Sequence, residues 1–171
     1  ARVAYAQKDL EAAKKAVDAV LAQSPSHTGA LTLRARLAWD MSQSDDAALK
    51  DLASVIEGPG KAIASSHEMS EAYAARGWVL LGRDRAGEAR SAFQEAVKLD
   101  PKNTSALIGQ GEILYADGRY AEALTRFDEA IAKDPKSLDA IIGSAKTKLQ
   151  LERLQESKTQ LAAANGAFPK N

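Results

Sequence analysis

Apolar and polar residues follow each other along the chain with the spacing of an α-helix. The clearest apolar stripe runs in steps of four, three and one residues and consists of Ala123, Phe127, Ala130 and Ile131. An earlier stripe holds Leu107, Gly111 and Leu114 on one helix face. Gly118 separates the two stripes, and glycine readily takes the left-handed conformation that ends a helix. The pattern therefore predicts a hairpin of two helices within residues 104–137.

This hairpin pattern recurs along the chain at intervals of 34 residues. One slot is always large and another is always small, and a proline closes each unit. The large slot holds Phe93, Phe127 and Leu161, and the prolines are Pro101, Pro135 and Pro169. There are three small slots: the first holds Gly77, Gly111 and Ala145, the second Ala89, Ala123 and Ser157, and the third Ala96, Ala130 and Ala164. Small residues allow close helix approach and the large residue fills the remaining gap.

The spacing and residue types of these slots resemble the tetratricopeptide repeat. The resemblance implies an all-α fold, a right-handed superhelical solenoid of antiparallel helix hairpins, over the single range 1–171. We assign a partial repeat to residues 1–27, full repeats to 28–59, 70–103 and 104–137, an insertion to 60–69, and a degenerate repeat to 138–171.

One interval departs from the period. Ala35 and Gly77 occupy equivalent slots but lie 42 residues apart, and the surplus falls between Gly58 and Met69. Its GPG letters indicate a turn, and the letters that follow fit one or two helical turns. A tolerated surface insertion, a binding loop and a local change in superhelix pitch all fit this segment.

Composition narrows the classes of function. Lys and Arg together equal Asp and Glu together, at 23 each, and no basic stripe is present, which argues against nucleic-acid binding. No apolar run reaches the ~18 residues that span a bilayer, so we expect no direct membrane insertion. The chain has no cysteine and therefore no disulfide. The first residues carry no Met, basic leader or apolar core, which indicates an excised fragment and leaves both the bacterial periplasm and the cytoplasm open.

Catalytic and cofactor-binding patterns do not emerge from the sequence. His27 and His67 fall in connections between hairpins and lack a second ligand at helical spacing. The letters GPGKA at 58–62 lack both the earlier glycine and the final Ser or Thr of a phosphate-binding loop. We therefore predict a chain that is not an enzyme and that has no cofactor and no metal.

The resemblance implies that the first helix of each hairpin lines a concave groove, the usual binding surface of the family. The residues predicted to line the groove are Arg36, Trp39, Trp78, Leu81, Ile108, Glu112, Tyr115, Ile142, Lys146 and Leu149. Only Arg36 and Lys146 are basic, which argues against the clamp for a terminal carboxylate found in chaperone-binding members. Trp39 and Trp78 fit either partner binding or packing between neighbouring helices.

We predict from these features a non-catalytic scaffold that binds a protein or peptide segment in a partly aromatic groove. By analogy alone, such a bacterial-type scaffold would organise a cell-envelope complex. Leu154 and Leu161 lie on a last helix with no following helix to cover them, so we expect further repeats to flank this piece in a larger multi-repeat protein; pairing of the open ends with another chain is the alternative. A structural spacer or self-assembly module is accordingly an alternative function. An accessory segment of an enzyme with its catalytic domain elsewhere is the other alternative.

Overall fold

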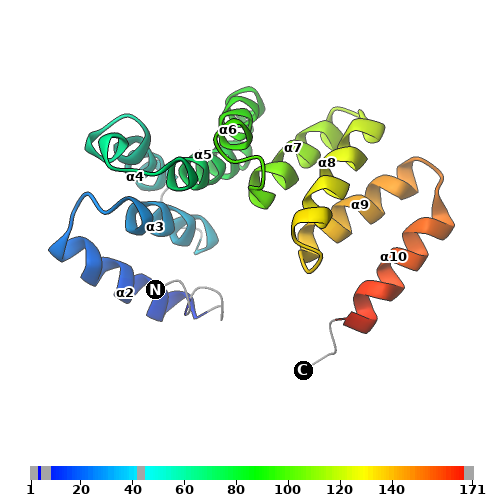
Figure 1. The fold of residues 1–171 in the computed structure, drawn as a ribbon, viewed down its shortest axis with the longest axis horizontal. Coiled ribbons are helices and arrows are strands. Elements are labelled where there is room, and N and C mark those ends of the chain that lie inside the picture. The colour runs from blue at the N-terminus through cyan, green and yellow to red at the C-terminus, as the bar shows by residue number, and fades with distance from the viewer. Residues whose placement is uncertain (1–3, 5–8, 42–44, 168–171) are drawn as a thin grey trace. The chain divides into compact units, whose positions relative to one another are not determined.

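The computed structural model describes residue 4, residues 9–41 and residues 45–167. These residues form nine α-helices and one short 3-10 helix, and no strand occurs among them. The elements are α2 (Leu10–Gln23), α3 (Thr28–Asp40), α4 (Asp45–Ile56), η1 (Pro59–Ala62), α5 (Ser66–Leu81), α6 (Ala86–Leu99), α7 (Thr104–Ala116), α8 (Tyr120–Lys133), α9 (Leu138–Gln150) and α10 (Leu154–Ala167) (Figure 1). The predicted all-α fold of helix hairpins is confirmed.

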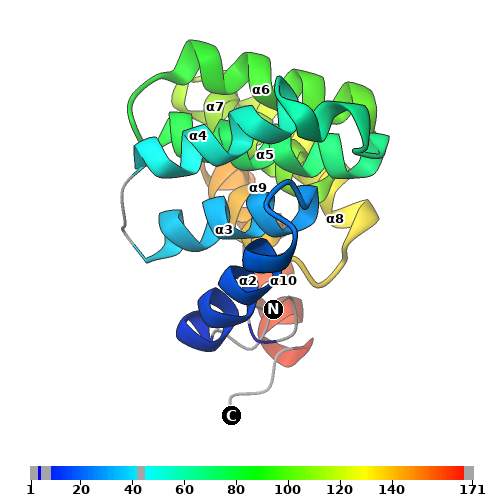
Figure 2. The same ribbon diagram turned by 90° about the vertical axis from the view of Figure 1, so that its left-hand side faces the viewer.

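The chain divides into two compact units, Ala1–Pro101 and Lys102–Asn171, which we call unit 1 and unit 2. In unit 1, α3 contacts α2, its hairpin partner α4, and α5 of the next hairpin (Figures 1 and 2). In unit 2, α9 contacts both helices of the preceding hairpin, α7 and α8, and its own partner α10. Each unit therefore stacks consecutive hairpins, and a single superhelix over residues 1–171 stays a prediction.

Side-chain caps form the starts of α7 and α9. The Asn103 side-chain oxygen accepts a hydrogen bond of 3.0 Å from the backbone N–H of Ala106. The Ser137 hydroxyl accepts one of 3.4 Å from the backbone N–H of Ala140. Each cap satisfies a backbone donor that has no partner inside its helix. Pro169 lies outside the described residues.

The large slots of two repeats, Phe93 and Phe127, form the centres of their hairpins. Phe93 and Phe127 are both completely buried. Each ring lies against glycine backbone: a Cβ atom added at Gly77 would lie 2.5 Å from Cε1 of Phe93. Cβ atoms added at Gly111 and Gly143 would lie 2.8 and 2.3 Å from Cε1 of Phe127. The small slots thus exist because the rings occupy the space that a side chain would need.

The turn between the two helices of a hairpin has the same backbone conformation in three repeats. Gly118 has a φ of 76°, and the equivalent residues Asp84 and Glu152 have φ of 57° and 58°. The turn thus needs a left-handed residue, which glycine supplies without strain. Directly after each turn, an arginine bonds a glutamate three residues later, with Nε–Oε1 distances of 2.6, 2.7 and 2.7 Å for Arg85–Glu88, Arg119–Glu122 and Arg153–Glu156.

We expect these three pairs to make stability depend on acid pH. The hydrogen bond from arginine holds the pKa of Glu88, Glu122 and Glu156 below the ordinary value of 4.5. A carboxyl group with a lowered pKa in the folded state contributes stability above its unfolded pKa and loses it as pH falls through the folded pKa. The melting temperature should therefore drop below about pH 4.5. Because all three glutamate side chains are more than half exposed to solvent, the drop should be modest.

Thermal melts between pH 7 and pH 3 would measure this effect. The control is the triple variant Glu88→Gln, Glu122→Gln and Glu156→Gln, which keeps the side-chain shape but removes the titration. The variant should show a smaller fall in melting temperature over this range. Identical pH profiles for the two proteins would contradict the prediction.

Candidate partner-binding surface

The predicted groove residues lie on the first helices of the hairpins, α3 and α5 in unit 1 and α7 and α9 in unit 2. We call the face of these helices that carries the predicted residues the first-helix wall, and each unit has its own part of it. Trp39 belongs to α3, but its side chain lies outside the described part of the structure.

In unit 2, a charge pair lies at the centre of the wall. Lys146 Nζ of α9 lies 2.6 Å from Glu112 Oε2 of α7, and both side chains are about one-third exposed. The same ammonium group lies 4.5 Å from the centre of the Tyr115 ring, a cation–π distance. Tyr115 in turn makes an edge-to-face contact with Tyr120. The ammonium group thus contacts both a carboxylate and an aromatic ring, and the pair leaves no net charge at this point of the wall.

Apolar side chains flank this pair along α9. Ile142 and Leu149 are 54% and 47% exposed. They are seven residues apart, so they lie on the same helix face, about 10 Å from each other along the axis. Ile108, which the sequence also assigned to the groove, is only 6% exposed. Ile108 therefore contributes to packing inside the unit, while Ile142 and Leu149 are available to a partner.

In unit 1, polar contacts join the two first helices. Arg36 Nη1 of α3 lies 3.4 Å from Glu71 Oε2 of α5, and the Thr28 hydroxyl donates a 2.7 Å hydrogen bond to Glu68 Oε1. Thr32, one turn from each of these α3 residues, is buried. Arg36 is thus engaged within the unit, in the same way that Lys146 is engaged in unit 2.

The Trp78 ring points toward the core of its own hairpin. It makes an edge-to-face contact with Phe93, with ring centres 5.3 Å apart. Trp78 and Leu81 are both partly exposed. The sequence left two interpretations open for Trp78, and this contact supports packing. The exposed part of the Trp78 side chain still belongs to the wall.

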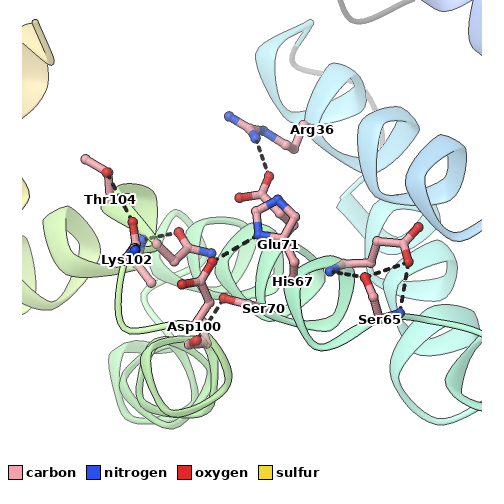
Figure 3. Close-up of polar contacts among 12 residues, drawn as sticks. Arg36, Ser65, His67, Ser70, Glu71, Asp100, Lys102 and Thr104 are labelled. Carbon is pink, nitrogen blue, oxygen red and sulfur yellow. Dashed lines mark hydrogen bonds and ion pairs between the residues drawn. The ribbon is translucent and has the colours of Figure 1, made fainter. Parts of the chain in front are cut away.

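The insertion supplies the first turn of α5 in unit 1. After η1, α5 begins at Ser66, one helical turn earlier in the repeat than α7 begins in the next hairpin. A capping box starts this turn: Ser65 Oγ accepts from the Glu68 N–H, and Glu68 Oε2 accepts from the Ser65 N–H. His67 Nδ1 lies 3.0 Å from Asp100 Oδ2 at the end of α6 (Figure 3).

This additional turn therefore connects three helices of unit 1. Glu68 reaches α3 through Thr28, and His67 reaches the end of α6 through Asp100. The Ser70 hydroxyl, in the next turn, donates a 2.8 Å bond to the carbonyl of Ala96 in α6 (Figure 3). The sequence indicated helical turns in this segment but gave no sign of these bonds, because they depend on which helices lie nearby.

The described residues contain no group of three or more His, Cys, Asp or Glu side chains that could hold a metal ion. Among those same residues, every helix is too short or too polar to cross a membrane. The surface offers apolar area, the partly exposed rings of Trp78 and Tyr115, and paired charges, which suit contact with another polypeptide.

Two family models described as tetratricopeptide repeat match the chain, one over residues 1–62 and 74–137 and the other over residues 114–171. These matches cover well over half of the residues. The chain belongs to the tetratricopeptide repeat family. A search of curated proteins gave no match.

Several solved structures share the fold. A thermophilic TPR protein of Thermus thermophilus is 23% identical, with a TM-score of 0.75 over 98% of this chain and 87% of that chain. PilW, a widely conserved type IV pilus biogenesis factor, is 19% identical, with a TM-score of 0.74 over 99% of this chain and 76% of that chain. YrrB, a TPR protein with an unusual peptide-binding site, is 20% identical, with a TM-score of 0.60 over 99% and 84%. At these identities the likeness establishes the fold alone.

Proposed function

We propose that the chain is a non-catalytic scaffold that binds a segment of a protein partner on its first-helix wall. The observation that carries the proposal is the exposure of Ile142 and Leu149 on either side of the neutralised Lys146–Glu112 pair. Exposed apolar side chains beside an aromatic ring are typical of the centre of an interface. Membership of the tetratricopeptide repeat family and the peptide-binding site of YrrB, a protein of the same fold, support this assignment.

The geometry of the wall in unit 2 favours a partner with two apolar anchors. A separation of about 10 Å between anchors corresponds to seven residues of a helix or three residues of an extended chain. Because Lys146 and Glu112 neutralise each other, the partner segment needs no charged residue between its two apolar anchors. For the wider role, we propose a bacterial cell-envelope complex, supported by the likeness in fold to the pilus biogenesis factor PilW.

Selection from a phage-displayed library of random peptides would test this binding. We expect enriched peptides to share two apolar residues at one of the two spacings above. The double variant Ile142→Glu and Leu149→Glu should weaken their binding at least about tenfold by isothermal titration calorimetry, because it places charges where anchors dock. Val20→Glu, at an exposed apolar position of α2 in unit 1, is the control and should bind as the wild type does.

Two results would count against the proposal. One is the failure of any peptide to enrich above background. The other is equal binding of the enriched peptides by the double variant and by Val20→Glu.

A further inference from the structure

Unit 1 contains a cavity of about 380 Å³ that is lined by residues of α2, α3 and α4, the three helices in the lower and middle part of Figure 2. Its apolar lining comes from Leu37, Ala38 and Met41 of α3 and from Ala48 of α4. Sites for small molecules in proteins have volumes of about 300–1,000 Å³ and a mostly apolar lining. The cavity therefore has the size and the lining of a site for a small organic molecule.

The space coincides with a small residue in a slot that is large in the next two repeats. Ala38 occupies the slot that Leu80 fills 42 residues later and that Leu114 fills after a further 34 residues. Leu80 is only 2% exposed, so in the α5–α6 hairpin this slot adds a leucine side chain to the core. The slot of Ala38 lacks that bulk, while the adjoining lining residues Leu37 and Ala48 are buried.

The cavity lies on the side of α3 away from the first-helix wall. Arg34, Ala38 and Met41, which all line it, follow each other at four and three residues and so share one face of α3. Successive residues of a helix are turned by about 100°, so Arg36 of the wall points about 160° away from Arg34. A molecule in the cavity would therefore leave the wall in unit 1 open.

Positive charge exceeds negative charge around the cavity. Arg34 forms a two-pronged ion pair with Asp51, with Nε–Oδ2 and Nη2–Oδ1 distances of 2.6 Å each. Lys14 of α2 and Lys50 of α4 add two further positive charges to the lining, and Lys50 is exposed without an ion pair to any described residue. Asp18 of α2 also interacts with Arg34, at longer range. Even with Asp18 counted, three cations outnumber two carboxylates.

We propose that this cavity binds a small organic acid, whose apolar body fills the space beside Leu37 and Ala38 and whose carboxylate pairs with Lys50. The flexible four-carbon stem of lysine allows its ammonium group to follow a carboxylate at the mouth of the cavity. Arg34 and Asp51 satisfy each other, so they shape the lining and leave the recognition of charge to lysine. This site is separate from the partner-binding surface and adds a second binding activity to the chain.

Titration of octanoate into the ¹⁵N-labelled chain, followed by NMR, would test the site. Octanamide is the matched ligand, because it has the same apolar body without the charge. We expect octanoate to shift amide signals of α3 and α4 around Ala38 and Ala48, and to bind at least about tenfold more tightly than octanamide, since hydrogen bonds to a charged group are the stronger ones.

Two variants test the apolar and the charged part of the site separately. Ala38→Leu restores the residue of the next two repeats and should abolish octanoate binding, while its melting temperature stays equal to or above that of the wild type. Lys50→Gln should weaken octanoate binding at least about threefold and leave octanamide binding unchanged. Lys15→Gln, at an exposed position of α2 outside the lining, is the matched control and should bind octanoate as the wild type does.

Three results would overturn the inference. They are the absence of saturable octanoate binding at millimolar concentration, equal affinities for octanoate and octanamide, and unchanged octanoate binding by a folded Ala38→Leu variant. Because the cavity and the first-helix wall lie on opposite sides of α3, none of these results alters the peptide selection that tests the proposed function.

Discussion

Phe127→Ala is expected to lower the free energy of unfolding by about 3–5 kcal/mol, the usual cost of removing a buried aromatic ring. The ring is fully buried in unit 2 and lies against both Gly111 of α7 and Gly143 of α9. Removing it leaves a cavity between three helices, since the surrounding backbone cannot collapse far enough to fill the space. Urea denaturation followed by circular dichroism at 222 nm would measure the loss.

Leu161→Ala is the matched control for this prediction. Leu161 occupies the same slot of the next repeat, but it is 42% exposed. Its truncation removes a contact that is only partly formed, so the expected cost is about 1 kcal/mol. Equal costs at the two positions would contradict the assignment of the Phe127 ring to the shared core.

Gly143→Ala is expected to destabilise unit 2 by about 1–3 kcal/mol, even though alanine favours helices over glycine by about 1 kcal/mol. The added methyl group would lie 2.3 Å from Cε1 of Phe127, closer than two carbon atoms can approach. A ring with solvent on one side could move away. The Phe127 ring has little room to do so, because it is completely buried and also lies against the backbone of Gly111.

Gly166→Ala provides the comparison for Gly143→Ala. Gly166 also lies in a helix of unit 2, but no heavy atom lies within 4 Å of the position of an added Cβ. This substitution should be neutral or stabilising by up to about 1 kcal/mol, because only the helix preference of alanine acts there. Thermal melts should therefore show a lower melting temperature than the wild type for Gly143→Ala and an equal or higher one for Gly166→Ala. A stabilising effect of Gly143→Ala would show that the Phe127 ring is not confined.

The repeat pattern was sufficient to predict the hairpins. Large and small residues alternate at fixed intervals because each buried ring needs glycine or alanine beside it, as Phe127 shows with Gly111. The caps at Asn103 and Ser137 were predictable for a similar reason, since they act on backbone only three residues away. Interactions between residues close in sequence can therefore be predicted from the sequence.

The candidate surface was less predictable, because exposure depends on what covers a residue. Ile108 and Ile142 have the same letter in the same slot, yet they are 6% and 54% exposed. Trp78 looked like a wall residue from its slot, and its ring contacts Phe93. The bonds from Glu68 and His67 likewise join helices distant in sequence, so no spacing rule reveals them.

The position of Phe127 also bears on how unit 2 loses its structure. A single ring is in contact with two successive repeats, so the stabilisation that it provides belongs to the junction rather than to either repeat. In a linear array, junction terms of this kind make neighbouring modules melt together. The α7–α8 and α9–α10 hairpins should therefore behave as one cooperative block, and hydrogen exchange of their central amides should report a common opening free energy.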